Sequence, residues 1–178
     1  MTRPFLPALA LIVTAACASS QRRGPPGGFP PPDISFTQPH AVAVTGVPQL
    51  PGFSTAVKVG NTVYLSGQVP LDSAGHLVGK GDLGAQAAQA FANMAHVIRA
   101  ARGVPADLVQ LTVYVVGYDT SAAGVVRRAV EPYVEPLVPP ALTIVGVATL
   151  PEPNMLIAVD GIAVLRGQLP DKMRDRGR

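Results

Sequence analysis

The sequence predicts a single α+β domain in which one sheet carries two helices on one face. Runs rich in β-forming residues recur at 55–65, 108–116, 141–149 and 155–165, and only two segments with helical spacing separate them. Apolar residues make up 48% of the chain and charged residues 14%, which excludes a globally disordered protein. Such a sheet keeps one face uncovered, and oligomerisation through that face is its simplest cover.

The N-terminus is expected to be an export signal covering residues 1–16. Arg3 precedes an uncharged run that would span roughly 20 Å as a helix, which is too short for a bilayer core of about 30 Å. The sequence Thr14-Ala15-Ala16-Cys17 resembles a bacterial lipobox, which predicts lipidation at Cys17 and anchoring in the cell envelope. Ordinary cleavage after Ala18 is the alternative and would leave a soluble secreted or periplasmic protein.

The rest of the chain divides by composition into a tether over 17–44, a folded domain over 45–165 and a disordered tail over 166–178. The tether is rich in proline and glycine, and the tail is basic. The chain carries a net charge of +3, but the domain holds six basic against eight acidic residues, so the excess lies at the ends. The ends could meet anionic lipid or cell-envelope polymer, whereas the domain gives no reason to expect nucleic acid.

Two elements open the domain. A hairpin is predicted over 55–65 around the turn at Gly60-Asn61, with Val57 and Val59 on one face and Lys58 on the other. After a loop over 68–80, Asp82 can cap a helix that runs to about residue 101. The apolar stripe of this helix consists of Leu83, Ala87, Phe91, Met94 and Ile98, and Gly103 and Pro105 end it.

The second half of the domain continues with a strand over 108–116. A second helix is predicted over 122–134, with a kink or an early end at Pro132 because proline removes a backbone hydrogen bond. Strands over 141–149 and 155–165, joined by a turn, complete the sheet.

Common chemical motifs give little support for a metal or a cofactor, and none is expected. Residues 79–84 match G-x-G-x-x-G, but no proper strand precedes them and no acidic residue ends the next strand, so loop glycines are the better interpretation. His40, His76 and His96 lack the spacing and companions of metal ligands. No nucleophile elbow of the G-x-S-x-G type is present.

Several segments, in the right order over about residues 48–165, resemble the RidA (YjgF-type) reactive-intermediate deaminase family. The resemblance implies a chorismate-mutase-like fold and a homotrimer whose sheets pack around a central axis, with a ligand cleft at each subunit boundary. Active members hydrolyse enamines and imines to keto acids and ammonia. The segments are Pro51-Gly52-Phe53-Ser54, Val59-Gly60-Asn61, Val63-Tyr64, Ser66-Gly67-Gln68-Val69-Pro70, residues 86–93, Thr112-Val113-Tyr114-Val115, Pro140-Ala141-Leu142-Thr143, Leu150-Pro151 and residues 160–164.

Three positions depart from the pattern that the resemblance implies for an active member. Leu142 stands where an arginine grips the substrate carboxylate, Ala158 stands where a glutamate positions water, and Phe53 replaces a tyrosine. An asparagine of the second helix falls near 125–127, where an insertion blurs the match. Leucine offers no donor to a carboxylate, so the predicted cleft is more apolar and lacks the usual deaminase mechanism.

Two functional hypotheses arise for this divergent member. The first is a protein that binds a small apolar or uncharged metabolite without hydrolysing it. The second is an imine or enamine deaminase in which Arg127 or Arg128 replaces the lost arginine. A trimer with a vestigial cleft that acts only as a scaffold is a third possibility, and RNA cleavage, a label some relatives carry, is the weakest. The predicted cleft consists of Phe53, Ser66, Gly67, Arg127, Leu142, Ile144 and Ala158.

Overall fold

The computed structural model describes residues 38–49, 51–134 and 137–166. The expected export signal with Cys17, most of the tether and all of the tail beyond Arg166 lie outside the described residues. The described chain forms one six-stranded sheet in the order β1-β2-β3-β6-β4-β5. The elements are β1 His40–Ala41, β2 Ala56–Val59, β3 Thr62–Gln68, α1 Leu83–Ala100, β4 Leu108–Val116, α2 Thr120–Val130, β5 Ala141–Val147 and β6 Ile157–Val164, with short 3₁₀ turns at Pro105–Asp107 and Glu131–Tyr133.

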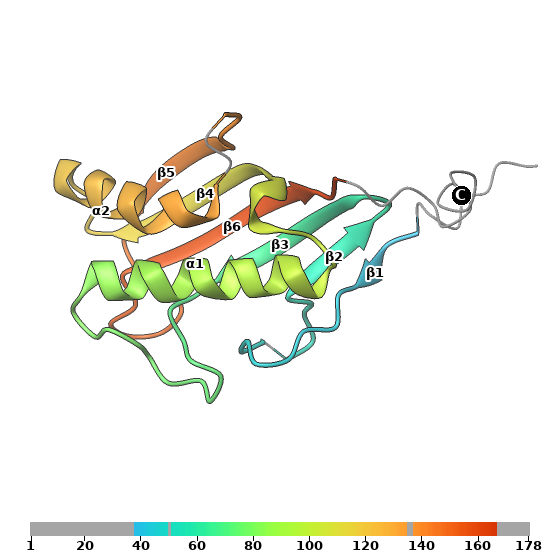
Figure 1. The fold of residues 1–178 in the computed structure, drawn as a ribbon. Helices are drawn as coiled ribbons and strands as arrows, with labels where there is room; N and C mark the ends of the chain where they lie inside the picture. Colours follow the sequence, from blue (N-terminus) through green and yellow to red (C-terminus); the bar gives the residue numbers. More distant parts are fainter. Residues whose placement is uncertain (1–37, 50, 135–136, 167–178) are drawn as a thin grey trace, which may run out of the picture. The chain divides into compact units, whose positions relative to one another are not determined.

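Neighbouring strands run antiparallel except for β4 and β5, which are parallel and are joined through α2. Both helices cover the same face of this mixed sheet (Figure 1). Helix α1 packs against β3 and β6, and α2 lies beside it. The predicted fold class, a single sheet with two helices on one face, is therefore confirmed.

Helix α1 forms as its sequence pattern predicts. The carboxylate of Asp82 accepts hydrogen bonds from the backbone nitrogens of Gly84 and Ala85 at 2.8 and 3.1 Å, which satisfies donors that a helix start leaves free. Four of the five stripe residues, from Ala87 to Ile98, are fully buried, and Leu83 packs half-buried against the same core. The core therefore lies between this helix and the central strands.

Helix α2 is shorter than its predicted range. Asp119 caps its N-terminus, and the α-helix ends at Val130, where a 3₁₀ turn containing Pro132 takes over. The early end at Pro132 is explained by the missing backbone N–H of proline. The buried face of α2 consists of Ala122, Val126 and Val130, spaced by one helical turn each.

The sheet begins before residue 45, where the domain was expected to start. Strand β1 pairs with β2 through His40↔Lys58 and Ala41↔Val57, and Val42 and Val44 pack against the core. His40 therefore lies on an edge strand and not in a tether. Gly79 belongs to a loop with φ of +69°, and a Cβ there would approach that of Ala85 to 2.6 Å, in line with the loop interpretation of the G-x-G-x-x-G match. Within the described ranges, no helix is long and apolar enough to cross a membrane.

Candidate functional site

The face of the sheet opposite the helices, which we call the open face, carries most of the polar strand residues. Residues that pair across strands project to the same face, so Tyr64 lies beside Ile162 and Thr112 beside Asp160. Among the described strand residues of this face, only Asp160 carries a formal charge at neutral pH. The open face consists of Val57 and Val59 on β2, Thr62, Tyr64 and Ser66 on β3, Ala158, Asp160, Ile162 and Val164 on β6, Gln110, Thr112, Tyr114 and Val116 on β4, and Ala141, Thr143, Val145 and Val147 on β5.

A β-bulge at Ser66 and Gly67 interrupts the pairing of β3 with β6. The register passes from Leu65↔Gly161 to Gln68↔Val159, so two residues of β3 lie opposite Asp160 alone. Both bulge residues are exposed. A Cβ added to Gly67 would meet nothing within 4 Å, so the space beside the bulge is open.

Side chains on both flanks hold this bulge. The Ser66 hydroxyl donates to the Thr55 carbonyl at 2.9 Å, and the Gln68 amide nitrogen donates to the Ser66 carbonyl at 2.9 Å. Gln68 is 2% exposed, and its side-chain oxygen has no partner among the described residues. Because these bonds fix the backbone on either side, the bulge is a preformed feature of the strand.

Next to the bulge lies a tyrosine–carboxylate pair that the sequence alone did not reveal. The hydroxyl of Tyr114 donates a hydrogen bond of 2.9 Å to Asp160 Oδ2. This hydrogen bond, together with partial burial and the negative charge, raises the pKa of Tyr114 above its ordinary value, so its hydroxyl stays protonated. Tyr114 also pairs with Ala158, two residues before Asp160 on the same face. The sequence did offer a signal for Asp160. Alternate residues of a strand share a face, so Asp160 lies on the same face as Ala158, which belongs to the predicted cleft.

The structure thus brings Ser66, Gly67 and Ala158 of the predicted cleft into one region, together with Tyr114 and Asp160. We call these five residues the bulge group. Ala158 is 6% exposed and lies next to the Tyr114–Asp160 pair, because it is the cross-strand neighbour of Tyr114. The arrangement offers one negative charge, two hydroxyl groups and backbone at a bulge, on a sheet face that mixes hydroxyl, amide and apolar side chains.

Leu142 and Ile144 lie on the opposite face of the sheet. They pair with Leu111 and Val113, whose side chains point toward the helices. Ile144 packs against the core, whereas Leu142 remains 47% exposed because β5 is an edge strand. The alternation of strand residues therefore prevents Leu142 from meeting the bulge group within one chain. A cleft that contains both must use two copies of the chain.

The two arginines of α2 point in different directions. Arg128 lines an open hollow of about 410 Å³ between the helices, together with Asp82 and Ala88 of the α1 side. Arg127 comes one residue earlier, about 100° around the helix, on the flank away from α1. Of the two arginines, only Arg128 therefore lies in the hollow that α2 shares with the start of α1. Both arginines are exposed.

Phe53 and the apolar hollow at the other end of the strands stand apart from these groups. Phe53 lies in the loop before β2 and is 72% exposed, so its ring is largely free of contacts within the chain. A hollow of about 320 Å³ lies where β4 begins and β6 ends, and it contains none of the predicted cleft residues. At its edge, Arg166 Nε donates to the buried carboxylate of Asp107 at 3.1 Å. This ion pair ties the end of β6 to the start of β4.

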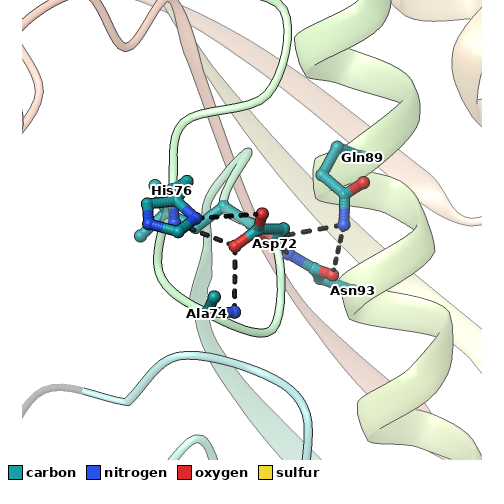
Figure 2. A network of polar contacts seen from close by, with 6 residues as sticks. Asp72, Ala74, His76, Gln89 and Asn93 are labelled. Atoms are coloured by element: carbon teal, nitrogen blue, oxygen red, sulfur yellow. Dashed lines mark hydrogen bonds and ion pairs between the residues drawn. The ribbon is translucent and has the colours of Figure 1, made fainter.

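A separate polar network fastens the loop after β3 to α1 (Figure 2). Asn93 is 6% exposed and donates to the carbonyls of Val69 and Leu71, each at 2.9 Å, while Gln89 donates to the Asn93 side chain at 2.9 Å. Farther out, the Asp72 carboxylate accepts bonds from the backbone of His76 and Ala74, which lowers the pKa of Asp72. The network holds the loop in place and brings no third acidic or histidine side chain near. Within the described ranges, no group of three such residues could hold a metal ion.

Comparisons with known proteins agree with this fold and with the order of its motifs. Residues 45–165 match the family model described as Endoribonuclease L-PSP. A 2-iminobutanoate/2-iminopropanoate deaminase of Dermatophagoides farinae is 35% identical over 114 residues, which cover 64% of this chain and 85% of that protein. A RutC family protein of Pyrococcus horikoshii is 31% identical over 113 residues, covering 62% and 85%.

Solved structures of similar proteins have the same architecture. RidA from a Psychrobacter species superposes with a TM-score of 0.63 at 31% identity, covering 71% of this chain and 99% of that one. The YjgF gene product of E. coli gives a TM-score of 0.61 at 29% identity, covering 70% and 98%. The uncovered parts of the chain are accounted for by its ends, since the family model spans 45–165. From its motifs, its sheet order and these matches, the chain belongs to the RidA/YjgF family.

Proposed function

We propose that this chain is a ligand-binding member of its family, which holds a small, mostly apolar metabolite between copies without arginine-dependent deamination. The observation that carries the proposal is Leu142, a half-exposed apolar side chain at the position where the family pattern places the carboxylate-binding arginine. Burying a carboxylate against leucine leaves its charge without a partner, which costs several kcal/mol. Ala158 removes the second polar group of the usual mechanism.

A homotrimer is part of this proposal. Both helices of the described chain lie on the same face of the sheet. On the open face, Val57, Ile162 and Val145 are among the apolar side chains that remain accessible or half-buried. The bulge group and Leu142 lie on opposite faces, so a cleft containing both closes only between two copies. In a closed symmetric assembly every copy makes the same contact, so the open face would be covered and the cleft between two copies would close in the same assembly.

The direct test measures ammonia release from freshly generated 2-iminobutanoate. We expect the wild-type chain to release ammonia no faster than the uncatalysed reaction, and Leu142→Arg to gain activity because its guanidinium can pair with the carboxylate. Turnover by the wild-type chain that survives Leu142→Ala would refute the proposal. The oligomeric state, measured in parallel by light scattering, shows whether a loss reflects disassembly.

A second candidate, a deaminase that uses a relocated cation, is favoured by the position of Arg127. It is exposed and lies outside the hollow between the helices, whereas Arg128 lines that hollow beside Asp82 and Ala88. If this candidate is right, Arg127→Ala abolishes turnover and Arg128→Ala, the matched control, leaves it intact. Equal effects of the two substitutions would count against a specific role of Arg127.

We also propose export and a lipid anchor at Cys17, which lies outside the described residues. Support comes from the basic start, the short apolar run and the small residues before the cysteine. The mass of the chain after membrane extraction should exceed that of the unmodified polypeptide, and Cys17→Ser should release the protein from the membrane fraction. A chain that begins at Ser19 and carries no lipid would instead support cleavage after Ala18.

A further inference from the structure

The Tyr114–Asp160 pair has a chemistry that neither the family resemblance nor the proposed function uses. Asp160 is the only formally charged side chain on the described strands of the open face at neutral pH, and it lies opposite the bulge at Ser66 and Gly67. A carboxylate on an exposed polar surface is ordinary. A single carboxylate on a sheet face otherwise made of hydroxyl, amide and apolar side chains is not.

The Asp160 carboxylate can accept hydrogen bonds in addition to the one from Tyr114. It accepts one hydrogen bond from the described residues, whereas an ionised carboxylate offers about four acceptor positions. The tyrosine hydroxyl occupies Oδ2 and thereby orients the group. On the other side, the neighbouring Gly67 has no side chain, and a Cβ there would touch nothing within 4 Å. Asp160 therefore lies opposite a bulge beside which this chain leaves space unfilled.

An imino acid carries a carboxylate, which needs a positively charged partner, whereas the charged side chain of this site, Asp160, is itself a carboxylate. A carboxylate ligand would approach Asp160 as a like charge, and Leu142, on the other wall of the proposed cleft, would supply no cation. A protonated amine or an N–H donor would instead be attracted and could donate to Asp160. The exposed Ser66, and the lack of a second formal charge among the described strand residues of this face, suit a small ligand whose remainder is uncharged.

We propose that the bulge group recognises a small ligand carrying a protonated amine or another N–H donor and no carboxylate, with Asp160 as the acceptor and Tyr114 as its positioning residue. The inference rests on the proposed ligand-binding function and adds the class of ligand to it. It also differs from the family pattern, in which the ligand is held through its own carboxylate.

The test compares three probes of the same size, n-butylammonium, butyramide and butyrate, at equal ionic strength and neutral pH. Binding to the full chain is measured through the backbone amide signals of Ser66, Gly67 and Asp160 in NMR spectra. We expect the ammonium ion to bind most tightly and butyrate most weakly. Asp160→Asn should weaken the ammonium complex by about tenfold or more, since a charge-assisted hydrogen bond is lost.

Two further variants separate recognition from a purely structural role of the pair. Tyr114→Phe keeps the carboxylate, so the preference for the ammonium ion over butyrate should survive with a smaller loss of affinity. Asp72→Asn, the matched control, removes a carboxylate from a distant loop and should change nothing. Loss of assembly in Asp160→Asn with an unchanged probe preference in the remaining oligomer would overturn the inference.

Failure of the inference and failure of the proposed function are distinguishable. Tighter binding of butyrate than of n-butylammonium refutes the choice of ligand class but leaves ligand binding intact. The absence of binding by all three probes refutes the inference, while the proposed function is decided separately by the ammonia-release assay. An ammonium preference that survives Asp160→Asn also overturns the inference, because the charge would then come from another residue.

Discussion

The two faces of the sheet are built by the same strands but differ in what they contain. On the helix-covered face, Val63, Val113 and Val159 are fully buried. On the open face, their sequence neighbours Tyr64, Tyr114 and Asp160 are exposed or half-exposed, and two of them form a hydrogen-bonded pair. Since the side-chain period of a strand is two, one sequence can encode a stabilising face and a recognition face at once. Substitutions on each face can test this division.

The largest effect is expected from Phe91→Ala on the covered side. Phe91 is fully buried on α1, and its ring stacks on Tyr133 with the centroids 6.3 Å apart. Removal leaves a cavity that costs about 3–5 kcal/mol of unfolding free energy. Chemical denaturation measures the loss, with Tyr64→Ala on the open face as control at a concentration where the chain is monomeric. A Tyr64→Ala variant as destabilised as Phe91→Ala would break the division between the faces.

A smaller loss is expected from Gln86→Ala, a polar side chain on the covered side. Gln86 is fully buried, donates to the carbonyls of Gly79 and Asn154 at 3.1 and 2.9 Å, and accepts from the Leu156 nitrogen at 2.7 Å. Truncation leaves these backbone groups unpaired, at about 1–3 kcal/mol. Denaturation should show the loss, and hydrogen exchange at Leu156 should accelerate. The half-buried Gln89→Ala is the control, and an equal loss there would argue against the anchoring role.

The smallest effect is expected from Tyr114→Phe, and it concerns how stability declines as the pH rises into the alkaline range. The folded state raises the pKa of Tyr114, so the stability linked to its proton is fully present below about pH 10 and is lost as pH rises through the higher folded value. Tyr114→Phe should therefore flatten the decline of the melting temperature between about pH 9 and pH 11. Tyr64→Phe removes a hydroxyl from the same face without touching Asp160 and should keep the wild-type slope. Identical slopes in all three proteins would mean that the pair is not formed in solution.

Local patterns were sufficient for most of the secondary structure. The cap at Asp82, the stripe from Ala87 to Ile98 and the early end of α2 at Pro132 all depend on interactions within one or two helical turns, which a sequence displays directly. The sequence did not predict strand β1, because two residues are too few to show the alternation that identifies a strand. Its place in the sheet depends on pairing with Lys58 and Val57, which are distant in the sequence.

The candidate site was only partly predictable for the same reason. The family pattern pointed to Ser66, Gly67, Leu142 and Ala158, but a pattern of residue types does not say which side chains meet. Which residues share a face depends on register, and the bulge that puts Ser66 and Gly67 opposite Asp160 forms only when β3 and β6 are paired. The hydrogen bond between Tyr114 and Asp160 spans 46 positions of the chain and could not be read from either strand alone.

The sequence by itself determined the fold class and the order of the elements from β2 onward, because these depend on residue type and local periodicity. That Leu142 stands where active members carry an arginine is what the family resemblance implies. The tertiary structure decided that Leu142 and the bulge group lie on opposite faces, that Arg127 and Arg128 point to different flanks, and that Asp160 is paired with Tyr114. Those facts arise from strand register and helix orientation, which are set by packing between distant segments and not by any one of them.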